Sequence, residues 1–197
     1  THGAGDLGRV FFFAERAVAV AGWALGINPF DQPDVQEAKD NTAKVLGAEE
    51  PPAVEPAGDD ELRALLRGAE PPRYVAVMGY LPPSDELDAA VDDLRATIRD
   101  ATRAATTFGY GPRFLHSTGQ YHKGGPPTGV FLQLVREADE DVEVPGAGHT
   151  FGQLEAAQAT GDILTLRDHG LPAERVRLEG DPAAAVRALT ARIAEMT

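Results

Sequence analysis

Two histidines and a lysine fall within one short polar stretch, FLHSTGQYHKGG (residues 114–125). The stretch also holds hydroxyl and amide side chains and three glycines, and it begins with an apolar pair. Histidine changes its charge between about pH 5 and pH 8, so His116 is a candidate for moving a proton at neutral pH. The competing interpretation is a polar turn in which His116 is hydrogen-bonded for structural reasons.

A second candidate, Lys39, lies on the less polar face of an expected helix. It shares a stripe with Val35 and Leu46, at spacings that place residues on one helix face. The ammonium group could extend along this face to water, which would give it no chemical role. If a cleft holds it instead, it could bind an anion or take part in proton transfer. The residues alone leave both interpretations open.

The sequence predicts neither a metal site nor a nucleotide cofactor. His116, His122 and His149 could supply metal ligands, but they form no H-x-x-x-H helix motif and have no acidic partner at fixed spacing. The segment GGPPTG (124–129) is rich in glycine but lacks the phosphate-loop pattern G-x-x-x-x-G-K-[ST].

The charge of the chain disfavours two classes of partner. A formal net charge of −13 and a pI near 4.7 disfavour binding to nucleic acid or to an anionic membrane, since both need a basic surface. The apolar run at residues 10–27 is interrupted by Glu15 and Arg16, so we expect no membrane span. The absence of cysteine excludes disulfides and thiol catalysis and fits a cytoplasmic location.

The first 72 residues predict two helices and a linker. Residues 7–26 carry apolar side chains on nearly every face, which is typical of a helix buried on all sides. A second helix is expected from Pro33 to about Leu46. Residues 48–72 are rich in proline, alanine and acidic residues and predict a linker that holds one short helix at 61–67.

From residue 73 onward, strand and helix signals alternate, which predicts an α/β sandwich with a mostly parallel sheet. Strands are expected at 74–81, 113–117, 129–135 and 174–178. Helices are expected after Ser84, with a stripe that runs as far as Ala105, and at 150–170 and 181–196. The predicted organisation is thus a helical part (1–47), a linker (48–72) and an α/β domain (73–197).

Two segments resemble the glucose-6-phosphate isomerase family: LGINPFDQPDVQEAK (25–39) and LHSTGQYHKGG (115–125). The chain resembles in particular the C-terminal part of bacterial bifunctional transaldolase/glucose-6-phosphate isomerases, and the similarity runs from about Asp6 to the C-terminus, without the linker. This resemblance implies a sugar-isomerase-like three-layer sandwich with a mostly parallel sheet. It also implies that residues 1–47 are the helical end of a preceding sugar-isomerase domain.

The resemblance further implies an active site that interconverts glucose 6-phosphate and fructose 6-phosphate without metal or cofactor. His116 would open the sugar ring, and Lys39 would stabilise charge near the ring oxygen or O1. Gln32, Ser117 and Gln120 match motif positions expected to bind the substrate. Isomerases of this family are usually dimers, so a homodimer is possible.

Two segments of the resembled family have no counterpart in these 197 residues: its S-K-S-G-T-T-like phosphate site and the segment with its general-base glutamate. We therefore expect this chain to be the C-terminal part of an isomerase, inactive without the remainder of the enzyme. The alternative is a non-catalytic packing or dimerisation module of a protein that contains a transaldolase.

Overall fold

The computed structural model of the chain describes residues 3–31 and 33–196. Contacts divide the chain between Pro33 and Asp34 into two compact units. Among the residues described, no helix is long and apolar enough to cross a membrane.

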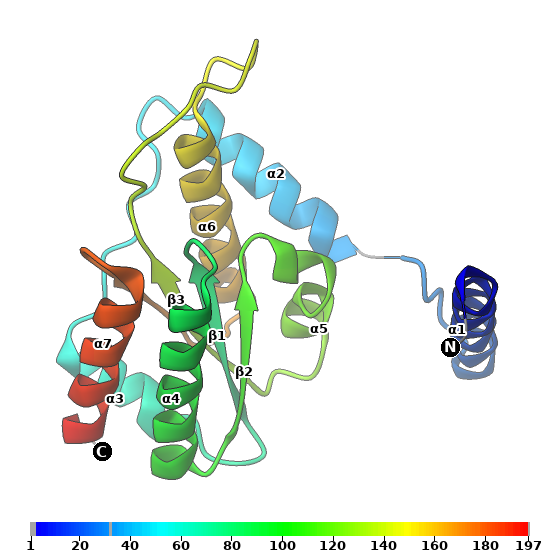
Figure 1. Cartoon of the computed structure of the whole chain (residues 1–197), viewed down its shortest axis with the longest axis horizontal. Helices are drawn as coiled ribbons and strands as arrows, with labels where there is room; N and C mark the ends of the chain where they lie inside the picture. Colours follow the sequence, from blue (N-terminus) through cyan, green and yellow to red (C-terminus); the bar gives the residue numbers. More distant parts are fainter. Residues whose placement is uncertain (1–2, 32, 197) are drawn as a thin grey trace. The chain divides into compact units, whose positions relative to one another are not determined.

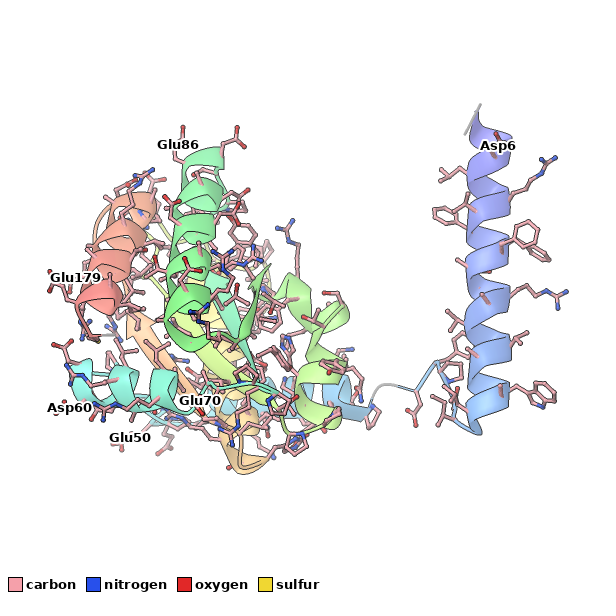
Figure 2. The ribbon with its side chains drawn as sticks, turned by 90° about the horizontal axis from the view of Figure 1, so that it is seen from below. Asp6, Glu50, Asp60, Glu70, Glu86 and Glu179 are labelled. Carbon is pink, nitrogen blue, oxygen red and sulfur yellow. The ribbon has the colours of Figure 1, made fainter. Side chains whose placement is uncertain are left out.

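The first unit contains one long helix, α1 (Ala4–Leu25), which ends at Gly26 in the left-handed conformation (φ 69°). The helix predicted for residues 7–26 is confirmed, but its predicted burial on all sides is wrong. Phe13 and Trp23 are 67% and 83% exposed, and side chains extend from α1 in all directions (Figure 2). The physical reason is that no other helix or strand is described within this unit to cover the apolar side chains.

The second unit is built on a sheet of four parallel strands in the order β2-β1-β3-β4. The strands are β1 (Tyr74–Tyr80), β2 (Ala105–Tyr110), β3 (Gly129–Val135) and β4 (Ala173–Arg177). The strands expected at 74–81, 129–135 and 174–178 correspond to β1, β3 and β4. The interiors of β1 and β3 are buried on both faces, which explains their continuous apolar sequences.

Helices cover both faces of this sheet (Figure 1). On one face, Val75 and Val77 pack in a core with residues of α3 (Asp59–Arg67), α4 (Asp85–Thr102) and α7 (Pro182–Met196). On the other face, Ala76 and Met78 pack in a core that includes α6 (Phe151–Asp168). The predicted α/β fold with three layers and a parallel sheet is therefore confirmed.

Two details of the prediction are wrong. The strand expected at 113–117 is a short 3₁₀ helix, η1 (Arg113–His116). Strand β2 begins at Ala105, the last residue of the predicted helix stripe, and no strand is predicted for its other residues. Helix α4 ends at Thr102 because Arg103 adopts the left-handed conformation (φ 63°), and the Thr102 hydroxyl accepts a hydrogen bond from the Ala104 amide. Neither glycine nor proline marks this helix end in the sequence.

The segment expected to be a linker packs against the α/β unit. Val54 is buried, the Ala57 amide donates to the carbonyl of Arg175 in β4 (2.7 Å), and the predicted short helix is α3. Helix α2 (Pro33–Gly47) contacts α6, where the Asn41 side chain donates to the hydroxyl of Thr165.

Candidate active site

Helix α2 carries Lys39, and a polar contact at its N-terminus links it to α5 (Gly119–Gly124). The Gln120 side-chain nitrogen donates to the carboxylate of Asp34 (2.6 Å), and its oxygen accepts from the Asp34 amide (3.3 Å). Both groups of the Gln120 amide are therefore used to join α5 to the first turn of α2. This contact connects the two segments that carry the candidate catalytic residues.

Lys39 and His116 line the same pocket, which we call the motif pocket and whose volume is about 250 Å³. Lys39 enters it from α2, and His116 enters it from the end of η1. The other lining residues are Val35, Ala38, Thr42, Ala43, Leu46, Pro112, Leu115 and Gln158. Two cation-forming side chains from distant parts of the sequence thus share one largely apolar pocket.

The chemistry that this pocket can perform is limited by its lining. Both Lys39 and His116 are exposed to solvent, so an incoming ligand can reach them. None of the described residues that line the pocket is a carboxylate. The motif pocket can therefore supply an imidazole and an ammonium group, whereas a carboxylate base would have to come from elsewhere.

The remaining predicted site residues lie in different surroundings. Ser117 is exposed, and its hydroxyl donates to the carbonyl of Phe114 within the same turn. Gln120 is engaged by Asp34, and neither Ser117 nor Gln120 is among the described residues that line the motif pocket. Gln32 lies outside the described residues. Their predicted role in substrate binding stays a prediction.

His122 is a core residue despite its place in the polar stretch. Its ring packs against those of Phe114, Phe131 and Tyr74, with centroid distances of 5.2 to 6.0 Å. Burial, with a smaller contribution from the charge of Lys123, lowers the pKa of His122 to about 4. The imidazole is therefore neutral at pH 7, and it helps to fix the loop that holds His116.

A buried ion pair lies beneath the same loop. The Lys123 ammonium is 2.6 Å from the carboxylate of Asp162 on α6, and both side chains are almost completely buried. Burial raises the pKa of Asp162, and the charge of Lys123 opposes this effect. Tyr80 lies beside the pair, and its own pKa is raised by burial and by the Asp162 carboxylate. Sequence reasoning missed Asp162, although an acid within the apolar run ATGDIL was a usable signal.

One group of residues in the described part of the chain could approach a metal ion, and it contains none of the three histidines considered from the sequence. Ligand atoms of Asp34, Glu37 and His169 lie within 4.8 Å of one another. However, His169 Nε2 is already 3.2 Å from the Glu37 carboxylate, and Asp34 binds Gln120. A metal ion would have to displace both contacts, so the arrangement favours a polar connection between helices.

Comparison with known proteins gives a local match in sequence and a wider match in fold. No protein-family model matches the chain. A segment of 41 residues is 51% identical to the glucose-6-phosphate isomerases of Heliobacterium modesticaldum and Exiguobacterium sibiricum, and it covers 21% of this chain and 9% of each enzyme. A segment of 40 residues is 50% identical to the enzyme of Clostridium perfringens, with 20% and 9% coverage. The chain thus matches less than a tenth of the length of these relatives.

The crystal structure of a hypothetical protein, TT0462, from Thermus thermophilus has a similar fold. The TM-score is 0.54 at 20% sequence identity, and the match covers 84% of this chain and 43% of that one. This similarity supports the fold and, at such low identity, nothing more specific.

Proposed function

We propose that this chain supplies part of the active site of a glucose-6-phosphate isomerase, with Lys39 and His116 as its catalytic residues. The observation that carries the proposal is that these two residues, predicted from separate motifs, line one pocket. The local identity of about half over some 40 residues to enzymes of that name supports it.

In the proposed reaction, His116 opens the sugar ring. It transfers a proton to the ring oxygen, while the hydroxyl on C1 of glucose 6-phosphate loses one. The Lys39 ammonium stabilises the negative charge that then develops on O1 or on the ring oxygen. A carboxylate removes the proton from C2 while O1 takes up a proton, which gives a cis-enediol. The carboxylate then returns its proton to C1 while the C2 hydroxyl loses its proton, which gives fructose 6-phosphate.

The proposal requires groups from outside this chain. The motif pocket has no carboxylate among its described lining residues, so the C2 base must come from the remainder of the isomerase or from a second subunit. We expect the 197-residue chain alone to show no interconversion of the two sugar phosphates above a buffer blank. Turnover by the isolated chain would contradict this part of the proposal.

The role of the two residues can be tested by substitution within the longer isomerase to which we assign this chain. Replacing His116 by Asn should lower kcat by about 10²- to 10⁴-fold, the usual contribution of a positioned proton-transfer group. Replacing Lys39 by Ala should lower kcat by about 10²- to 10³-fold, the usual cost of losing one group that stabilises developing charge. Lys44→Ala on the same helix and His149→Asn are matched controls, because neither residue lines the motif pocket. Equal rates in the site variants and in the controls would overturn the assignment.

A second candidate function is favoured by the exposed apolar side chains of α1. These side chains fit a packing or dimerisation module of a transaldolase-containing protein. Under this alternative, Trp23→Ser and Phe13→Ser would abolish assembly, as measured by light scattering after size-exclusion chromatography. The His116 and Lys39 variants would then leave both assembly and turnover unchanged.

A further inference from the structure

A second pocket lies where three strands of the parallel sheet end. Its volume is about 520 Å³, which is in the range of small-molecule sites. Tyr80, Val135 and Arg177, the last residues of β1, β3 and β4, line it together with residues of α6 and of the segment 52–56. We call it the edge pocket. None of the described residues lines both the edge pocket and the motif pocket.

The topology of the sheet makes this position significant. The strand order β2-β1-β3-β4 means that the chain adds β2 on one side of β1 and then returns to add β3 on the other. The order of the strands therefore reverses between β1 and β3. In open parallel sheets, the crevice outside the carboxyl ends of the strands at such a reversal is the usual place for a ligand.

The wall of the edge pocket contains a buried arginine that forms no ion pair with a carboxylate of the described residues. Arg175 is 7% exposed, and its described hydrogen bonds go to Gln133 Oε1 (2.7 Å) and to the hydroxyl of Thr160 (3.3 Å), both uncharged. The other two arginines of the wall, Arg136 and Arg177, are paired with Asp139 and Glu137. Burial lowers the pKa of Arg175 to about 10, so it remains a cation at pH 7. The buried Asp162 carboxylate offsets part of the cost of burying this charge without forming an ion pair with it, and a counter-ion in the pocket would offset more.

Hydroxyl groups flank this arginine. The Tyr80 side chain is 3% exposed, and its hydroxyl lies close to the buried Asp162 carboxylate but makes no hydrogen bond of good geometry within the described part of the chain. The hydroxyl of Thr160 also lines the pocket. An oxyanion bound by the Arg175 guanidinium could accept further hydrogen bonds from these two side chains.

Acidic residues elsewhere on the wall narrow the class of ligand. Glu55 and Glu155 make no ion pair among the described residues, and Asp141 is satisfied by the amides of Val142 and Gly152 and by the hydroxyl of Thr150. These carboxylates would repel a second anionic group on the ligand but accept hydrogen bonds from its hydroxyls. The lining therefore suits one oxyanion attached to a polyol.

We propose that the edge pocket binds a small hydroxylated oxyanion, a sugar acid or a sugar phosphate, through Arg175, Tyr80 and Thr160. This binding function is separate from the isomerase site proposed for the motif pocket. Its failure would leave the roles of Lys39 and His116 untouched.

The proposal can be tested by titrating the ¹⁵N-labelled chain with gluconate, glucose 6-phosphate, inorganic phosphate and neutral glucose. Gluconate or glucose 6-phosphate should give saturable shifts of the Arg175 Nε–H and Thr160 resonances, whereas glucose should give none. Comparing gluconate with glucose 6-phosphate distinguishes a carboxylate from a phosphate ligand, and inorganic phosphate shows how much the polyol contributes.

Substitutions test which residues hold the ligand. Arg175→Met should weaken binding by about tenfold or more, because a hydrogen-bonded charge is lost. Tyr80→Phe removes only the hydroxyl and should weaken binding several-fold. This variant tests the proposal if Arg175→Met does not fold. Arg167→Met is the matched control, since Arg167 is also hydrogen-bonded to β4 but does not line the pocket. Absence of saturable binding, unchanged affinity in both Arg175→Met and Tyr80→Phe, or shifts confined to residues near Lys39 and His116 would overturn the proposal.

Discussion

The motif pocket and the edge pocket differ in how their charged side chains are held. In the motif pocket, Lys39 and His116 are exposed and belong to a helix and a short 3₁₀ turn on the outer layer of the domain. In the edge pocket, Arg175 is buried on a strand whose backbone is paired with β3. The exposed Lys39, which we propose acts in catalysis, is held by a surface helix, whereas the buried Arg175, which we propose binds an anion, is fixed by the sheet.

The two pockets also differ in how far they can be predicted from short stretches of sequence. The motif pocket could be predicted from two short sequence motifs, because one motif contains Lys39 and the other contains His116. The edge pocket takes its walls from three strands, one helix, the loop after β3 and an extended segment, and it has no sequence motif of its own. Its ligand class can be argued only from the assembled structure.

The largest expected effect concerns the ion pair that supports both pockets. Lys123 follows the loop of His116, and Asp162 lies beside Tyr80 of the edge pocket. Lys123→Met leaves a buried carboxylate without its partner and should lower the free energy of unfolding by about 3–5 kcal/mol, measured by urea denaturation. Replacing both residues, as Lys123→Met with Asp162→Leu, should cost much less because no unpaired charge remains.

The exposed pair Arg99–Asp100 provides the control for this measurement. Arg99→Met should change the free energy of unfolding by no more than about 0.5 kcal/mol. If Lys123→Met changed the free energy of unfolding as little as this control does, the ion pair between Lys123 and Asp162 would not support the two pockets.

A smaller effect on the free energy of unfolding is expected from His122, which packs beneath the loop of His116 and is not among the described residues that line the edge pocket. Its pKa is about 4 in the folded chain and 6.5 when exposed, so between these pH values the unfolded state binds more protons. The free energy of unfolding should therefore fall as pH decreases from 6.5 to 4, by at most about 1.4 kcal/mol per pH unit from this residue. Above pH 6.5 the contribution to pH dependence disappears. His122→Leu should flatten the slope in this window, and His149→Gln should not.

The smallest expected effect tests whether the two pockets are independent. Gly161 of α6 lies against α2, and a Cβ there would be 3.1 Å from the Thr42 nitrogen. In Gly161→Ala, the gain in helix propensity opposes this close contact, so the free energy of unfolding should change by less than about 1 kcal/mol. The amide resonances of Lys39 and Thr42 should shift while the affinity of the edge pocket for gluconate stays the same. Gly47→Ala at the open end of α2 is the control, and a change in gluconate affinity would show that the pockets are coupled.

Much of the fold could be predicted from the sequence, and the errors have physical causes. The buried strands β1 and β3 are continuous apolar runs between turn residues, so they were found. Strand β2 was missed because Arg103 turns the chain in a conformation usually marked by glycine. Helix α1 was expected to be buried because apolar side chains on every face disfavour exposure, but burial depends on a partner that a helix sequence does not specify.

The candidate site could be predicted only in part, because some of its residues lie in motifs and others depend on contacts made in the folded chain. Lys39 and His116 each lie in a recognisable motif, and the fold brings them to one pocket. Arg175 and Asp162 gain their importance from residues on other elements, Thr160 and Lys123, at no regular spacing in the sequence. The sequence can mark Asp162 as an acid within an apolar run, but it does not show which residue pairs with it.

The bond between the Ala57 amide and the Arg175 carbonyl has a consequence for the kinetics of the edge pocket. Residues 52–56 form one wall of that pocket, and this bond ties the end of the wall to the same residue whose guanidinium would bind the anion. Solvent deuterium can replace the Ala57 proton only when the bond opens. The exchange rate of this one amide therefore counts the openings of the wall, whether or not a ligand is inside.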